Sequence, residues 1–196
     1  MANTSATGGI LTPASSPAPL SDDALEDFFQ EWVVGLTSFD PALVRPRWQA
    51  EPPNIPDTNT NWISLGITKT SPDTFAAELH YSNPSSYNEV RRHEELEILV
   101  SGYGPQSSSI LSILRDGMQV AQNREILSLN NMGLISSGDI LAVPELIKNI
   151  WTKRHDMRFW IRRQVKRNYG VLDLAEAQGT LNNELYIEQI TVRENP

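Results

Sequence analysis

The chain has 196 residues, a net charge of −8 at pH 7 and a sequence pI of about 4.9, and it contains no cysteine. Disulfides, thiolate catalysis and cysteine-ligated zinc are therefore excluded, and the acidic balance argues against a nucleic-acid-binding role for the whole protein. The length suffices for one domain with a real core. No apolar run reaches the roughly 20 residues that span a bilayer, and the first residues lack the basic and apolar regions of a signal peptide. We expect a soluble protein made in the cytosol.

Residues 1–20 consist almost entirely of Ala, Ser, Thr, Pro and Gly. Such a segment cannot bury enough apolar surface to offset its ordering entropy, so we expect a flexible N-terminal arm followed by a single domain over residues 21–196. A helix is predicted from Asp22 to Ser38, with an aromatic-rich stripe that favours packing on a sheet. The stripe consists of Leu25, Phe28, Phe29, Trp32, Val33 and Leu36.

Five prolines interrupt residues 40–60 and exclude a helix or an inner strand there. A structureless segment of this length is uncommon in a compact domain, and such segments are often functional. Arg45, Arg47 and Trp48 lie within it, and arginine and tryptophan are enriched at protein interfaces. The segment is therefore either a docking loop or a surface loop whose Trp48 packs on its own domain.

Alternating apolar residues predict strands over residues 61–68, 74–82 and 89–101. The first two are expected to form a hairpin, and all three an antiparallel meander. The third strand leads through the turn Gly102-Tyr103-Gly104-Pro105 into a helix over residues 106–121, which can fold back on the strand's apolar face. The helical stripe consists of Ile110, Ile113, Leu114, Gly117, Met118 and Ala121.

The last third of the chain is predicted as a series of short elements around one long strand. They are a helix at 123–130, one or two strands within 132–143, a helical turn at 144–146, the long strand at 151–169, a loop or short helix at 172–179 and a strand at 185–192. The whole pattern predicts an α/β (α+β) fold in which two main amphipathic helices flank a mixed, largely antiparallel sheet.

The long strand concentrates positive charge on an otherwise acidic chain. Residues 151–170 contain seven basic residues and one acid, whereas the rest of the chain has nine basic and 23 acidic residues. A solvated strand that protects a sheet edge, contact with an acidic protein surface and contact with nucleic acid are all compatible with this ridge. The seven basic residues are Lys153, Arg154, Arg158, Arg162, Arg163, Lys166 and Arg167.

No motif in the sequence predicts an enzyme, a cofactor site or a metal site. Gly102-Tyr103-Gly104 lacks the further residues of a nucleotide-binding loop, so backbone geometry explains its glycines. The three histidines, His80, His93 and His155, have no metal-binding spacing, and no Gly-x-Ser-x-Gly elbow is present. We expect structural or surface histidines and no catalytic residues.

Several short motifs follow one another along the chain. In the front half they are Arg45-Pro46-Arg47-Trp48-Gln49, Pro52-Pro53, Pro56, Trp62 and Gly66-Ile67-Thr68. In the middle and back they are His93-Glu94, Val100-Ser101-Gly102-Tyr103-Gly104-Pro105, and Trp151 followed by the basic strand Arg158 to Tyr169. These motifs are similar to those of phage neck, or tail, terminator proteins, and the similarity spans about residues 22–193.

The resemblance implies a small α/β structural protein that forms a homo-hexameric ring on the end of the completed tail tube. Such a ring stops tube polymerisation, meets the head connector or neck and, in contractile tails, contacts the last sheath ring. DNA would pass through its lumen without specific binding, and no membrane or cofactor is implied. The protein would belong to the virion tail or neck and be assembled in the host cytoplasm.

Ring subunits meet through unlike surfaces, so an acidic patch and a basic patch on each subunit form a natural pair. We expect the seven basic residues to face a protein, with Arg45, Arg47 and Trp48 as a second docking surface. Glu95 and Glu97 lie on the polar face of their strand and could supply the acidic surface. Another ring-forming tail or baseplate completion protein, a nucleic-acid-binding module and a small enzyme are the competing interpretations.

Overall fold

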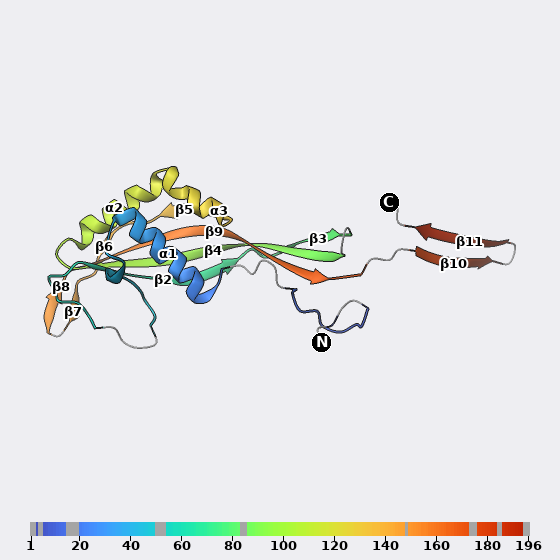
Figure 1. Ribbon diagram of the computed structural model, residues 1–196, viewed down its shortest axis with the longest axis horizontal. Coiled ribbons are helices and arrows are strands. Elements are labelled where there is room, and N and C mark those ends of the chain that lie inside the picture. The colour runs from blue at the N-terminus through green and yellow to red at the C-terminus, as the bar shows by residue number, and fades with distance from the viewer. Residues whose placement is uncertain are drawn as a thin grey trace. The chain divides into compact units, whose positions relative to one another are not determined.

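The computed structural model describes residues 3, 6–14, 20–49, 54–82, 86–147, 149–172, 176–183 and 186–193 (Figure 1). The chain divides into two compact units, and each is described by itself. Unit 1 comprises residues 1–18, 77–91 and 166–196, and unit 2 comprises residues 19–76 and 92–165. The predicted arm over residues 1–20 and the predicted single domain both stay predictions. Within unit 1, the Ala14 amide donates to the Asn168 carbonyl at 2.7 Å.

Helices and strands alternate irregularly along the chain. The helical elements are α1 (Asp22–Thr37), η1 (Pro41–Leu43), α2 (Ser107–Gln119), η2 (Gln122–Arg124) and α3 (Glu125–Leu129). The strands are β1 (Val44–Pro46), β2 (Trp62–Pro72), β3 (Ala77–Tyr81), β4 (Tyr87–Tyr103), β5 (Met132–Ser137), β6 (Leu141–Ala142), β7 (Glu145–Ile147), β8 (Ile150–Thr152), β9 (Arg154–Gly170), β10 (Glu176–Asn183) and β11 (Tyr186–Arg193).

The main sheet has the strand order β1-β2-β4-β9-β5, with β3 paired to β4 and β6 paired to β9. Strand β1 runs parallel to β2, whereas β2 with β4, β3 with β4, and β5 with β9 are antiparallel. Two separate two-stranded sheets, β7–β8 and β10–β11, are also antiparallel. This mixed, mostly antiparallel sheet with three α-helices confirms the predicted α+β fold.

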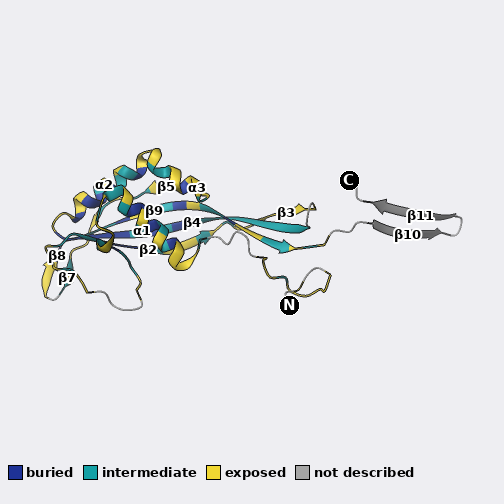
Figure 2. Ribbon diagram, in the orientation of Figure 1, coloured by how far each residue is buried: buried dark blue, intermediate teal, exposed yellow. Residues whose placement is uncertain are grey.

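The core of unit 2 lies between the helices and one face of the sheet (Figure 2). Apolar residues at helical spacing on α1 and α2 pack against alternate residues of β2, β4 and β9, because those side chains point to one face. The fully buried members include Phe29, Val33, Ile63, Leu65, Leu96, Ile98, Val100, Leu111, Leu114, Phe159 and Ile161. The prediction that the helix after β4 folds back on this strand is therefore confirmed.

The predicted stripe of α2 is wrong at two positions. Ile113 is 52% exposed, and Ala121 lies outside α2 on the surface. Leu111 takes the buried position instead, because the buried face runs through residues 107, 110, 111, 114 and 118, which continue the i, i+3, i+4 pattern from an earlier start. Gly117 is partly buried against Leu36 of α1, where it allows the two helices to approach closely.

Four other local predictions are corrected. Strands β2 and β3 do not form a hairpin, because each pairs with its own stretch of β4. Strand β2 extends to Pro72, through the gap between the predicted strands at 61–68 and 74–82, and the expected helical turn at 144–146 is the start of the β7–β8 hairpin. Strand β10 begins at Glu176, inside the segment predicted as a loop or short helix. In each case the strand that pairs with the segment is distant in sequence, or the segment itself shows no periodic pattern of apolar residues.

Proline and glycine act at defined places in unit 2. Pro46 lies in β1, at the edge of the main sheet, where a missing amide donor is tolerated. Gly104 has φ +97°, and a Cβ on it would lie 2.6 Å from the Thr60 carbonyl oxygen. A Cβ on Gly102 would lie 3.1 Å from the Ser107 carbonyl oxygen. Backbone geometry therefore explains the Gly-Tyr-Gly turn, as the sequence predicted.

Helix α1 carries five acidic residues and no basic ones, and this composition leads to a pH-dependent prediction. Partial burial raises the pKa of the Glu26 carboxyl, the Ile67 amide opposes the rise by donating to it, and Asp23 and Asp27 add to the rise. A raised pKa in the folded state favours folding at low pH, and this contribution is lost as pH rises through the folded pKa. Glu26→Gln should therefore stabilise the protein at pH 7 by about 0.3 kcal/mol.

Thermal unfolding of Glu26→Gln at pH 7 and at pH 4 checks this prediction. The gain should shrink at pH 4, where the native carboxyl is largely protonated. Glu31→Gln, on the exposed part of the same helix, is the matched control and should show no such difference. Equal behaviour of the two variants at both pH values would contradict the prediction.

Candidate functional site

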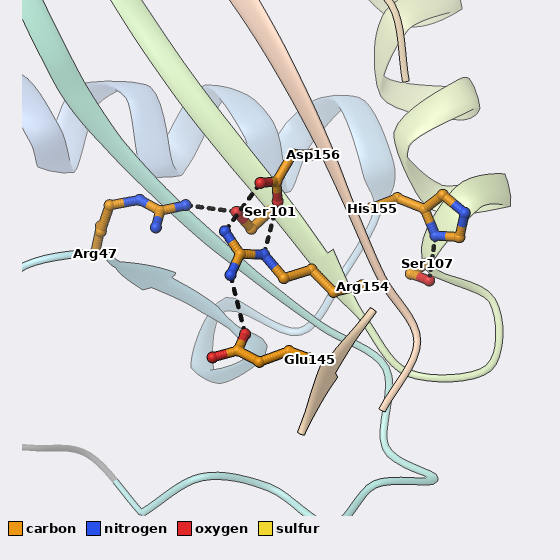
Figure 3. Close-up of polar contacts among 7 residues, drawn as sticks. All are labelled: Arg47, Ser101, Ser107, Glu145, Arg154, His155 and Asp156. Atoms are coloured by element: carbon orange, nitrogen blue, oxygen red, sulfur yellow. Dashed lines mark hydrogen bonds and ion pairs between the residues drawn. The ribbon is translucent and has the colours of Figure 1, made fainter. Parts of the chain in front are cut away.

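A polar network lies at one end of the main sheet in unit 2 (Figure 3). The Arg154 guanidinium donates from Nε and Nη2 to the two Asp156 carboxylate oxygens at 2.8 and 2.9 Å, and from Nη1 to Glu145 at 2.9 Å. Arg47 Nη2 donates to the Ser101 hydroxyl oxygen, and Ser101 also hydrogen-bonds Asp156. The network thus joins the segment after β1 to β4, β7 and β9.

Strand periodicity explains why these side chains meet. Arg154 and Asp156 are two residues apart on β9, so they point to the same face, away from Met157 and Phe159 in the core. Ser101 is paired with Ser64 of β2, and these small residues leave room for the guanidinium groups. The Tyr103 ring stacks on Trp62 with centroids 4.0 Å apart, and Arg154 Cζ lies 5.6 Å from the Tyr103 centroid.

The Arg154–Asp156 pair favours its ionised form, whereas Arg47 is only partly satisfied. Burial alone would raise the pKa of the Asp156 carboxyl, but hydrogen bonds from Arg154 and Ser101 outweigh it and hold that pKa below its usual range. Burial opposes the charge on Arg154, yet its bonds to Asp156 and Glu145 raise the pKa of this guanidinium. Burial lowers the pKa of Arg47, whose Nε has no hydrogen-bond partner among the described residues.

The arrangement ties surface segments to the main sheet. Arg154 holds β7 through Glu145, and Arg47 holds the segment after β1 through Ser101, so the sheet fixes both surface segments. Beside it, Ser107 Oγ shares a 2.8 Å hydrogen bond with His155 Nδ1. Among the described residues, no cluster of three or more His, Asp or Glu side chains could hold a metal ion. No helix in the described ranges has the length and apolarity to cross a bilayer.

Besides Arg154, three more arginines of the predicted basic ridge hold carboxylates of their own chain. Arg158 Nε lies 3.0 Å from Glu97 Oε1, Arg162 pairs with Asp73, and Arg163 pairs with Glu94 at 2.9 Å. Arg163 shares the core face of β9, where its Nη1 also donates to the Leu20 carbonyl at 2.7 Å. These pairs neutralise a large part of the positive charge of the ridge within unit 2. Glu97 contributes to this by pairing with Arg158 in the same sheet of the same chain.

The other predicted binding residues are more accessible. Lys153, Lys166 and Arg167 are exposed and have no ion-pair partner among the described residues. Arg45 ties the proline-rich segment together, since it donates to the carbonyls of Ala42 and Asn54 at 2.9 and 2.8 Å. Whether all of these residues bind a subunit or another protein stays a prediction.

The remaining two predicted residues also have defined places. Trp48 covers Gly66, where an added Cβ would lie 2.7 Å from the indole ring, yet more than half of the Trp48 side chain stays exposed. Glu95 lies opposite Ser71 in the β2–β4 pairing and is partly exposed. Trp48 thus packs on its own sheet, as one of the two sequence interpretations had it, and still presents an aromatic surface.

Sequence reasoning missed Asp156, Ser101 and Glu145 as members of the network. The Arg154-x-Asp156 spacing on a strand is a usable signal, because residues two apart share a face. Glu145 had no such signal, since its segment was predicted as a helical turn. Ser101 appeared as the last residue of a predicted strand and within a family motif, and neither marked it as a partner of Arg47.

Comparison with known proteins decides the family. The sequence pattern of the family described as phage neck terminator protein matches residues 23–184. The chain belongs to this family of phage neck terminator proteins. The recognition made from the short motifs is thus confirmed. No curated protein matches the sequence.

Family membership fixes the general role of the terminator. It is a bacteriophage structural protein of the virion neck or tail, and its partners belong to that assembly. The ionic network fits this role, because it holds two surface segments in place on the main sheet.

Proposed function

We propose that this terminator forms a hexameric ring that caps the tail tube, ends tube polymerisation and joins the tail to the head connector or neck. The observation that supports the proposal best is a set of exposed apolar side chains on and beside the β7–β8 hairpin, which the Arg154 network holds in place. Residues 55–58, Ile147 and Ile150 line one pocket, where Ile55 and Ile150 are exposed, and Leu146 and Trp151 are exposed on the other face of the same β7–β8 hairpin. Such exposed apolar clusters mark sites of protein contact, and the Arg154 network holds this one in place.

The charge distribution supports passage of DNA through the proposed ring. All five charged side chains of α1 are acidic, and the chain carries a net charge of −8. A surface of this sign repels phosphates and lets DNA slide. Within the basic ridge, Arg158, Arg162 and Arg163 are already paired with carboxylates, which reduces the attraction of the ridge for phosphates.

Negative-stain imaging of the purified protein, alone and with tail tubes, tests the proposal. We expect six-fold rings on one end of each tube, and capped tubes that no longer lengthen when tube subunits are added. A monodisperse monomer that leaves tube growth unchanged would contradict it. Rings on a baseplate instead of the tube end would favour a completion protein, and steep salt-dependent retention on DNA would favour nucleic-acid binding.

A further inference from the structure

The β7–β8 hairpin presents an apolar projection in unit 2. Leu146 and Trp151 are paired across the hairpin, so they share one face. They are 53% and 71% exposed, respectively. Glu145, at the start of the hairpin, is held by Arg154. The projection thus consists of Leu146 and Trp151 on a hairpin that is held through Glu145. Large exposed aromatic residues of this kind often contribute most of the binding energy of an interface.

A groove lies elsewhere on the same unit, between the η2–α3 segment and β5. It has a volume of about 320 Å³ and is lined by Ala121, Arg124, Glu125, Ser128, Gly133 and Leu134. No atom lies within 4 Å of the position that a Cβ on Gly133 would occupy, so this part of the groove is open. Leu129, on α3, is 82% exposed. Strand β5 is an edge of the main sheet.

The projection and the groove match in size and charge. A tryptophan side chain is large and apolar, and a groove of this volume with Gly133 at its floor can take it. Arg124 in the groove offers a cation for the indole face. Lys153 directly follows the hairpin and has no ion-pair partner in the described part of the chain, and neither has Glu125 in the groove. The groove thus offers Arg124 to the Trp151 indole and Glu125 to Lys153.

We infer that the β7–β8 hairpin of one copy docks into the α3–β5 groove of a second copy. The hairpin and α3 lie at separate places on unit 2, so the contact joins unlike surfaces of two chains (Figure 1). Repetition of such a head-to-tail contact gives a closed ring when the rotation between copies closes. This inference rests on the proposed ring and names the surfaces that would build it.

Trp151→Ala tests the projection. We expect self-association, followed by native mass spectrometry over a concentration series, to weaken by about thirtyfold or more, because a buried interfacial tryptophan contributes strongly to binding. The fold should be unaffected, since the side chain is mostly exposed in one chain. Phe75→Ala is the matched control, because Phe75 is also an exposed aromatic residue of unit 2, at 86%.

The absence of cysteine allows a second, geometric test. Leu146→Cys on the hairpin and Ser128→Cys in the groove are combined in one chain and treated with a short bismaleimide, in solution and on tail tubes. We expect a ladder of cross-linked species up to the hexamer. Each single variant should stay monomeric on a denaturing gel. Leu146→Cys combined with Glu31→Cys, on the exposed face of α1, is the control pair and should give no ladder.

The outcomes separate this inference from the proposed function. Six-fold rings that survive Trp151→Ala and give no ladder with the test pair would overturn the docking contact and leave the ring standing. Dimers formed by Leu146→Cys alone would also overturn it, because they would place two hairpins together. A wild-type chain that remains monomeric both in solution and on tubes would overturn the docking contact and the ring together.

Discussion

Gly104→Ala should lower the free energy of unfolding by about 3 kcal/mol. Gly104 has φ +97°, a conformation that alanine adopts only with strain, and the new Cβ would lie 2.6 Å from the Thr60 carbonyl oxygen and 2.7 Å from Asn61 Oδ1. The turn cannot move freely, because the Gly104 amide donates to the Lys153 carbonyl at 3.0 Å and its carbonyl accepts from the Ser107 amide at 3.2 Å.

Urea denaturation followed by circular dichroism measures this loss. Gly35→Ala is the matched control: Gly35 lies in α1 with no atom within 4 Å of its Cβ position, so alanine there should stabilise the protein by about 0.5–1 kcal/mol. If Gly104→Ala lowers the free energy of unfolding and Gly35→Ala raises it, the loss at Gly104 arises from its backbone conformation and not from replacing a glycine as such. A Gly104→Ala chain as stable as the wild type would refute the role assigned to this turn.

Asp156→Asn should destabilise the protein by about 2 kcal/mol at pH 7. The change removes the carboxylate that accepts two hydrogen bonds from Arg154, and it leaves the Arg47 and Arg154 guanidiniums near each other with only Glu145 as a counter-charge. The Arg154 and Asp156 side chains are 18% and 14% exposed, so solvent screens the pair only partly. Asp116→Asn, in an exposed pair with Arg115, should cost almost nothing.

The stability difference between wild type and Asp156→Asn should also depend on pH in a defined direction. Asp156 has a lowered pKa in the folded state, so its ionisation stabilises the protein above its unfolded pKa of about 3.9, and this contribution is lost as pH falls through the folded pKa. The stability difference between wild type and Asp156→Asn should therefore be full at pH 6–7 and shrink below about pH 4. A difference that is constant from pH 7 to pH 3 would show that the cost arises from packing.

Elements with a long periodic signal could be predicted from the sequence. Helix α1 begins and ends within one residue of its predicted bounds, because six apolar positions repeat at helical spacing. The core face of β9 follows from the alternation of Met157, Phe159 and Ile161. In both cases the side-chain period and the burial requirement agree, so local chemistry suffices.

Elements that are too short to show a period, and contacts between residues distant in sequence, could not be predicted. Strands β7 and β8 have three residues each, which is too short for a period, and Pro144 suggested a helix start. The positive charges of the basic ridge could be read from the sequence, but the carboxylates that pair with them could not. Glu97 meets Arg158 only because the fold places β4 beside β9, and Asp73, which directly follows β2, reaches Arg162 from the far side of β4. Such pairing is a property of topology and not of sequence neighbours.

The contact between Arg163 and the chain just before α1 has a mechanical consequence. Arg163 Nη1 donates to the Leu20 carbonyl, and the same guanidinium is paired with Glu94. A pull on the residues that precede Leu20 is therefore transmitted to β9 and β4 at this point, before it reaches the first turn of α1. The load falls on two long strands that resist shear, so the helix can keep its packing while the preceding segment is under tension.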